Sequence, residues 1–175
     1  LDVQGWLDLR QRPLPSTRAE IVEALIGRRF VTRQSEGLAI TNLGALVLAK
    51  RRSDFASVAR KAVRVIVYDG VTKMQVKDGK DWVADSGYAV GFVKLVDQIH
   101  AETPASEEIR AALRQTTHAY PKKALREILG NALVHQDLSE RGTGVVVEIY
   151  DDRVEIVNPG RPLLDVDRCI DENQS

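Results

Sequence analysis

The stretch from Tyr120 to Asp137 constrains the fold of this chain most, because it combines a helix start with a long apolar stripe. Pro121 suits the first helical position, where no amide donor is needed and its fixed φ angle favours the helix. Apolar residues then recur at intervals of three and four, which indicates an amphipathic helix. The members of this stripe are Ala124, Leu125, Ile128, Leu129, Ala132 and Leu133.

Three polar residues of the same stretch, Glu127, Asn131 and His135, follow one another at intervals of four. Side chains at this spacing lie one above the other on one face of a helix. A carboxylate, an amide and an imidazole would then be directed into one cleft. Glu and Asn are also common on solvated surfaces, so the spacing alone favours the solvent-exposed side of the helix over a functional row.

Composition limits the protein to a few classes. A length of 175 residues allows one domain, or one domain plus a small module, with a real core. A hydrophobic content of 43% and a charged content of 29% exclude a disordered chain. The formal net charge of zero gives no indication of a nucleic-acid partner.

Cysteine usage and targeting signals suggest a compartment. The single cysteine, Cys169, excludes an intramolecular disulfide and a complete cysteine zinc site, and it fits a reducing cytosol. We find no signal peptide and no apolar run long enough to span a bilayer. We therefore expect a cytoplasmic protein with no membrane partner. The chain begins without Met, and we expect both ends to be cuts in a longer protein.

Residues 1–53 are predicted to form a first unit. Its expected elements are an apolar-periodic piece at 3–9, a helix capped by Ser16 or Thr17 and ending near residue 28, strands at 30–33 and 37–41, and a helix at 43–50 capped by Asn42. This order is compatible with a winged-helix fragment.

The same unit is basic through Arg28, Arg29, Arg33, Lys50, Arg51 and Arg52. These residues suit a module that contacts phosphates. The lack of an obvious recognition helix favours the alternative of a packing unit with an ordinary basic surface.

Residues 54–175 are predicted to form a second unit. A β-branched run at 62–68 indicates a strand, 78–81 a loop, and 88–101 a helix with Val93 among its largely buried residues. The segment 106–118 is compatible with either a helix or a strand. His100 is expected to be a surface residue or a partner of the helix dipole. His118 is expected to be structural, because it has no metal partner at ligand spacing.

A hairpin follows the predicted helix. Runs 145–150 and 153–157 are apolar and β-branched, and Asp151-Asp152 forms the turn between them. The second run ends in Asn158-Pro159-Gly160, where a glycine lets the backbone approach a ligand closely or simply makes a turn.

The order of these parts resembles the ATP-binding fold of gyrase-type topoisomerases, sensor histidine kinases and mismatch-repair ATPases. In particular, it is similar to the family of putative transcriptional regulators, or RecG-helicase-related ATP-binding proteins. The matching residues are Tyr120-Pro121, Ala124, Glu127, Asn131-Ala132, His135, Asp137, Arg153, Glu155 and Asn158-Pro159-Gly160, with a looser match over 38–50.

This resemblance implies an α+β fold: a helix-on-sheet, Bergerat-like sandwich over 54–175, incomplete at its C-terminus, preceded by the winged-helix-like unit. It also implies a site for ATP and Mg²⁺. Asn131 would bind the metal ion, and Glu127 would be the catalytic base that polarises water. His135 would lie near the phosphates, and Asn158 and Gly160 would take the place of an adenine-sensing Asp-x-Gly.

Some positions depart from the family pattern. Asn158 stands where active ATPases usually carry Asp, and Gln136 and Leu138 replace the family's Arg and Tyr. The glycine-rich box that closes over the phosphates is absent, since the chain stops before its place. The family also has an N-terminal domain thought to bind nucleic acid, and this chain is expected to start after it.

Two hypotheses follow. The first is an ATP-binding fragment of a DNA-binding transcriptional regulator, inactive alone as an ATPase, with DNA bound through the parent protein. The second is a non-catalytic DNA-binding or dimerisation module on a degenerate ATPase fold. Glu127 and Asn131 favour the first, whereas Asn158 and the missing glycine box favour the second. Homodimerisation is compatible with both.

Overall fold

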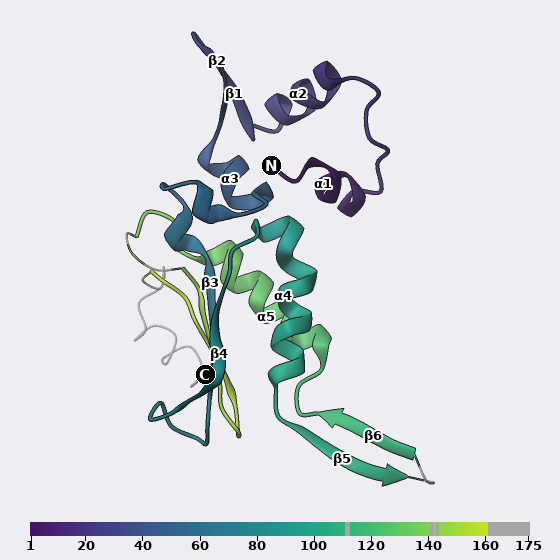
Figure 1. The fold of residues 1–175 in the computed structure, drawn as a ribbon, viewed down its shortest axis with the longest axis vertical. Helices are drawn as coiled ribbons and strands as arrows, with labels where there is room; N and C mark the ends of the chain where they lie inside the picture. The colour runs from purple at the N-terminus through teal and green to yellow at the C-terminus, as the bar shows by residue number, and fades with distance from the viewer. Residues whose placement is uncertain (111–112, 141, 143, 161–175) are drawn as a thin grey trace, which may run out of the picture.

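A computed structural model describes residues 1–110, 113–140, 142 and 144–160 and has an α+β architecture with a mixed four-stranded sheet (Figure 1). The elements are α1 (Val3–Leu9), α2 (Arg18–Gly27), β1 (Val31–Gln34), β2 (Gly37–Ile40), α3 (Asn42–Leu48), η1 (Arg52–Asp54), η2 (Ala59–Lys61), β3 (Val63–Tyr68), β4 (Val76–Ala84), α4 (Tyr88–Glu102), β5 (Ala105–Arg110), β6 (Leu113–His118), α5 (Lys122–His135), β7 (Val146–Ile149) and β8 (Val154–Val157).

Threonine side chains cap the N-termini of two helices, α2 and α3, within residues 1–53. Thr17 accepts a hydrogen bond from the Glu20 amide at 3.2 Å, which confirms one of the two predicted caps of α2. The prediction that Asn42 caps the next helix is wrong by one residue. Thr41 is the cap of α3, and its hydroxyl accepts from the Gly44 amide at 3.0 Å. The predicted hairpin between these helices is confirmed as the antiparallel pair β1–β2.

The four-stranded sheet has the order β4-β3-β7-β8. Strands β3 and β7 are parallel neighbours, whereas β3–β4 and β7–β8 are antiparallel. A parallel pair needs a crossover connection, and the chain between β3 and β7 includes α4 and α5. Figure 1 shows both helices on the same side of the sheet. The predicted 145–157 hairpin is confirmed as β7–β8.

The main core lies between this sheet and the two helices. Alternate strand residues such as Val65 and Val147 are fully buried and face Leu129 of α5 and Ile99 of α4. A separate cluster around Trp6 and Leu48 joins α1, α2 and α3. Each valine or leucine taken out of water contributes about 1.5–3 kcal/mol, so these two clusters hold the elements in place.

Three details of the second segment differ from the sequence predictions. The expected loop 78–81 lies inside β4, because Asp81 pairs with Ile66 of β3 and a register shift accommodates the Asp78–Lys80 stretch. Val93 is 53% exposed instead of buried, and Ile128 of the predicted apolar stripe is also 53% exposed. Helix α5 therefore buries a narrower stripe, Leu125, Leu129 and Ala132, than the sequence pattern suggested.

The segment 105–118, ambiguous in sequence, is an antiparallel hairpin, β5–β6. Figure 1 shows that it projects away from the sheet and helices. Neither strand pairs with any other described strand.

Across the residues that the structure describes, we find no helix with the length and apolar character needed to cross a membrane.

Candidate functional site

The predicted polar row lies on the solvent side of α5. Glu127, Asn131 and His135 are all exposed, and the buried residues of the helix lie on the other side, against the sheet. The row spans about 12 Å, since eight residues of helix rise about 1.5 Å each. The three side chains are therefore available to a ligand on the outer face of α5.

The Asn158-Pro159-Gly160 loop meets the end of this helix. The Asp137 amide donates to the Pro159 carbonyl at 3.0 Å, which joins the turn after α5 to the residues after β8. Gly160 has a φ of +126°, and a Cβ at this position would lie 2.9 Å from the Cβ of Asp137. This approach needs glycine, because any side chain would push the loop off the helix end. Asn158 and Gly160 are both exposed beside it.

Asp137 itself is held by local hydrogen bonds. Its carboxylate accepts from the Ser139 hydroxyl at 2.6 Å and from the Ser139 amide at 2.8 Å. These hydrogen bonds lower the pKa of Asp137 below its ordinary value. The turn after α5 therefore has a defined shape at neutral pH.

Lys61 supports the same turn from beneath. This lysine is buried, and its ammonium donates to the carbonyl oxygens of Asp137 at 3.1 Å and Glu140 at 2.7 Å. Gly144 packs directly on this region, because a Cβ there would lie 2.7 Å from the Lys61 carbonyl oxygen. A buried charge is tolerated when it is hydrogen-bonded, and here the carbonyls fix the turn relative to η2.

A buried polar network continues from Lys61 to α5. The Tyr88 hydroxyl donates to the Lys61 carbonyl and accepts from the Gln136 amide at 3.0 Å. Gln136 also donates to the Leu133 carbonyl at 2.9 Å. Gln136 therefore hydrogen-bonds the last turn of α5 from the buried side. Burial raises the pKa of Tyr88 and keeps its hydroxyl protonated.

Arg52 completes this network. It is fully buried, its guanidinium lies 4.5 Å from the centre of the Tyr88 ring, and it donates to the carbonyls of Lys61, at 3.3 Å, and Ala84. Burial lowers the pKa of Arg52 from its ordinary value, although the group stays charged. The Arg52 side chain therefore ties η1 to the end of β4 and the start of α4.

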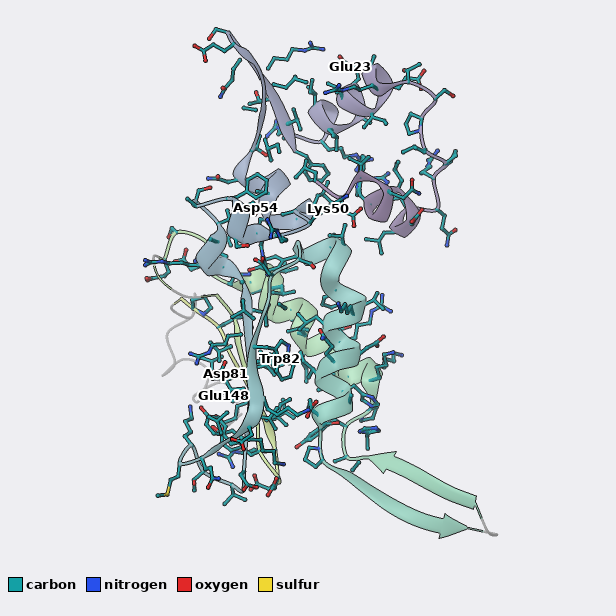
Figure 2. All side chains as sticks on the ribbon, viewed as in Figure 1. Glu23, Lys50, Asp54, Asp81, Trp82 and Glu148 are labelled. Carbon is teal, nitrogen blue, oxygen red and sulfur yellow. The ribbon has the colours of Figure 1, made fainter. Side chains whose placement is uncertain are left out.

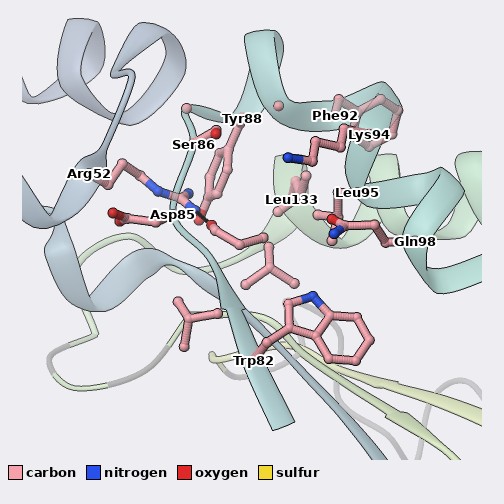
Figure 3. A pocket seen from close by; sticks show the side chains of 15 residues that line it. Arg52, Trp82, Asp85, Ser86, Tyr88, Phe92, Lys94, Leu95, Gln98 and Leu133 are labelled. Atoms are coloured by element: carbon pink, nitrogen blue, oxygen red, sulfur yellow. Dashed lines mark hydrogen bonds between the residues drawn. The ribbon is translucent and has the colours of Figure 1, made fainter. Parts of the chain in front are cut away.

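A cavity of about 140 Å³ adjoins this network, between β4 and α4 (Figure 3). Arg52, Trp82, Tyr88, Lys94 and Gln98 are among its lining residues, and Figure 3 shows the Trp82 indole nitrogen facing the space beneath α4. That nitrogen is buried and has no hydrogen-bond partner. The volume is sufficient for ordered water, which would satisfy this donor.

The opposite face of the sheet carries a second polar cluster. Figure 2 shows Asp81 and Glu148 on the side away from Trp82 and α4. The buried Glu148 carboxylate accepts from the Lys73 ammonium at 2.6 Å and from the Tyr68 hydroxyl at 3.2 Å. These bonds satisfy the buried charge, and the cluster is separated by the sheet from the helix row.

Two histidines meet at the base of the β5–β6 hairpin. The rings of His100 and His118 lie 4.0 Å apart, and the His118 Nδ1 is 3.2 Å from the Thr103 hydroxyl oxygen. Burial is the main cause that lowers the pKa of His100, followed by the charges of His118 and Lys122. The described residues include no group of three or more His, Cys, Asp or Glu side chains suited to a metal ion.

The basic residues of the first unit do not form one free cationic surface. Arg52 is buried, Arg33 pairs with Glu23, and Arg51 pairs with Asp54 at 2.8 Å. Arg28 and Arg29 are exposed. The charge available for a polyanion is therefore smaller than the sequence suggested.

The structure thus joins the helix end to the Asn158–Gly160 loop. Lys61, Tyr88 and Arg52 support this junction, although the sequence did not predict that role for them. No local pattern marks them, because their partners come from distant segments of the chain. The one feature of the sequence that could have marked them is their position as polar residues beside predicted strands and helices.

Comparison with known proteins places the fold but not an activity. No family model and no curated protein matches this sequence. The fold is similar to that in the crystal structure of the DIP2311 protein from Corynebacterium diphtheriae, with a TM-score of 0.58 and 19% identity. The match covers 92% of this chain and 30% of that one, so this chain spans about a third of that protein's length.

Proposed function

We propose that this chain is the Mg-ATP-binding part of a DNA-binding regulator, with the nucleotide held between the outer face of α5 and the Asn158–Gly160 loop. The observation that carries this proposal is the hydrogen bond from the Asp137 amide to the Pro159 carbonyl. This hydrogen bond brings Asn158 and Gly160, which follow β8, to the end of the helix that carries the exposed Glu–Asn–His row. On this proposal, the helices and sheet form the Bergerat-like sandwich expected from the sequence.

Each residue has a distinct role in this proposal. The Asn131 side-chain oxygen would be a protein ligand of Mg²⁺, whose remaining ligands would be phosphate oxygens and waters. This division suits a site with few acidic side chains. Bound Mg²⁺ would neutralise phosphate charge. The Glu127 carboxylate, one turn earlier, would orient water and accept its proton.

The His135 end of the row, together with the Asn158–Gly160 loop, would hold the adenine ring and the remaining phosphates. His135 would donate a hydrogen bond to a phosphate oxygen. The Asn158 side-chain oxygen would accept from the adenine amino group, without the charge of an aspartate. Gly160 would allow close approach of the ring. A cytoplasmic location agrees with an ATP ligand and with a single cysteine.

Calorimetric titration of Mg-ATP into the 175-residue chain tests the proposal. We expect binding in the unaltered protein and at least about tenfold weaker binding in Asn131→Ala, equivalent to about 1.4 kcal/mol. Arg126→Ala is the matched control, because Arg126 is exposed on the same helix but about 100° around from Glu127. Glu127→Gln should retain binding and lose any hydrolysis.

A second titration isolates the metal role. With Mg²⁺ removed by EDTA, ATP should bind the unaltered protein and Asn131→Ala with similar affinity, because the substitution then removes no metal ligand. Absence of Mg-ATP binding in the unaltered chain contradicts the proposal. Equal affinity of Asn131→Ala and the unaltered chain for Mg-ATP would also reject the assigned site.

The alternative function is a non-catalytic DNA-binding or dimerisation module. It is favoured by the order of helices and hairpin in α1–α3, which suits a winged helix, and by the exposed Arg28 and Arg29. Its test is duplex binding measured over a range of salt concentrations. Phosphate contacts require affinity to fall steeply with salt, and Arg28→Ala/Arg29→Ala should reduce that slope.

A further inference from the structure

The β5–β6 hairpin is a two-stranded sheet, and no third strand joins it among the described residues. An isolated hairpin is marginally stable in water, and stability usually requires a third strand or a packed helix. Neither strand has another strand partner among the described residues, and Figure 1 shows the hairpin extending away from the body. Within the described part of the chain, each strand therefore presents one edge whose backbone groups pair with no other strand.

The base of the hairpin, by contrast, is fixed to the body. The Ala119 amide donates to the Pro104 carbonyl at 2.8 Å. This hydrogen bond closes the base of the hairpin, where the chain leaves α4 and where it approaches α5. The Thr103 hydroxyl donates to the His100 carbonyl at 2.7 Å and contacts His118. The hairpin is thus presented in a set direction, as a recognition element would be.

We propose that this hairpin joins two copies of the chain by pairing the β6 edges antiparallel about a two-fold axis. The result would be a continuous four-stranded sheet, β5-β6-β6-β5. Closed two-fold dimers are the commonest homo-oligomers, and addition of a strand to an open edge is a recurrent mode of recognition. This interface is separate from the nucleotide site and does not depend on it.

Symmetry restricts how such strands can pair. Rotation about a two-fold axis normal to the sheet keeps a residue of the upper face on the upper face. Residues that stand directly opposite each other in an antiparallel pair also point to the same face. The residue on the axis must therefore stand opposite its own copy. For a six-residue strand, the registers with greatest overlap place one of the two central residues on the axis.

Charge then distinguishes the two edges. The central residues of β5 are Glu107 and Glu108, so either register would place a glutamate opposite its own copy, which is destabilising. The central residues of β6 are Gln115 and Thr116, and both are uncharged. With Gln115 on the axis, Arg114 stands opposite Thr116 of the second copy. The β6 edge can therefore pair with itself, whereas the β5 edge is protected against doing so.

Sedimentation equilibrium without nucleotide tests the assembly. We expect the unaltered chain to form dimers in a concentration-dependent manner and Gln115→Glu/Thr116→Glu to be monomeric. Ser106→Glu is the matched control, because it adds charge to the same hairpin on the strand outside the interface, and it should still dimerise. Circular dichroism confirms that the variants remain folded. A monomeric unaltered chain, or a double variant that still dimerises, overturns the proposal.

The single variants identify the register. Gln115→Glu alone should disrupt a dimer with Gln115 on the axis, whereas Thr116→Glu should disrupt one with Thr116 there. In the first register Thr116→Glu would face Arg114 of the second copy and leave the dimer intact. If neither single variant weakens the dimer, the symmetric β6 pairing is wrong.

Cross-linking tests the edge directly. Opposed residues of an antiparallel pair lie about 4.5–5.5 Å apart at Cα, within the range a disulfide spans. In a Cys169→Ser background, oxidation should link two chains through Gln115→Cys or Thr116→Cys, but not through Glu107→Cys or Glu108→Cys. Cross-linking through β5 positions alone, or equally through both strands, would overturn the assignment to β6.

Discussion

Removing the Arg52 side chain tests whether the buried network of Arg52, Lys61 and Tyr88 holds η1 against the end of β4 and the start of α4. In Arg52→Ala, two hydrogen bonds from a charged donor, to the Lys61 and Ala84 carbonyls, are lost. At about 1.5 kcal/mol each, they represent about 3 kcal/mol. The Tyr88 cation–π contact adds about 1–2 kcal/mol.

Relief of a buried charge offsets part of this loss, because burial already lowers the pKa of Arg52. The Lys61 carbonyl also keeps its bond from Tyr88, whereas the Ala84 carbonyl loses this donor. We therefore expect a net loss of about 3 kcal/mol in the free energy of unfolding.

Urea denaturation measures this loss. With a slope of about 2–3 kcal/mol per molar, a loss of about 3 kcal/mol lowers the midpoint by about 1–1.5 M. The urea midpoint of Arg52→Lys should lie between those of Arg52→Ala and the unaltered chain, because an ammonium cannot reproduce the planar set of N–H donors of a guanidinium. Arg52→Met is the comparison for size without hydrogen bonding.

Two outcomes would refute this reasoning. A change below about 0.5 kcal/mol in Arg52→Ala would match an ordinary surface substitution and show that the network contributes little. If Arg52→Met were as stable as the unaltered chain, packing of the side chain would account for the stability, and the hydrogen bonds and ring contact would not.

Two further predictions concern a glycine and a histidine. Gly160→Ala should weaken Mg-ATP binding measured by calorimetry, because its Cβ would meet Asp137; Gly142→Ala, with a similar φ of +125° but open space around it, should not. His100 has a lowered pKa, so its neutral form stabilises the fold above the ordinary pKa of about 6.5, and this contribution is lost as the pH falls below it. Urea midpoints at neutral and acidic pH should show a smaller difference in His100→Gln than in the unaltered chain, and an equal difference would exclude a role for the His100–His118 pair.

Local sequence patterns predicted much of the secondary structure. The Thr17 cap and the two-residue turn at Asp151-Asp152 act over a few residues, so their signals lie in the sequence itself. The same reasoning failed at Asp78–Asp81, whose composition favours a loop. Pairing of Asp81 with β3, supported by its ion pair to Arg64 at 2.5 Å, outweighs that local preference.

The 105–118 segment shows a different limit. Its apolar residues are compatible with a helix and its threonines with a strand, and neither preference is strong. Closure of its base between α4 and α5 favours the hairpin, because the Ala119–Pro104 bond brings the two ends together. A segment with weak local preference takes its conformation from what its ends are attached to.

The sequence by itself determined that α5 exists, that Glu127, Asn131 and His135 share one of its faces, and that a hairpin follows and ends in Asn158–Gly160. Each depends on spacing along a single element. Only the tertiary structure decided that this face is exposed and that the Asn158–Gly160 loop meets the end of the helix. The Asp137–Pro159 bond and the Lys61 contacts join residues far apart in the chain. Such contacts arise from the packing of the whole sheet and its helices, and no local pattern encodes them.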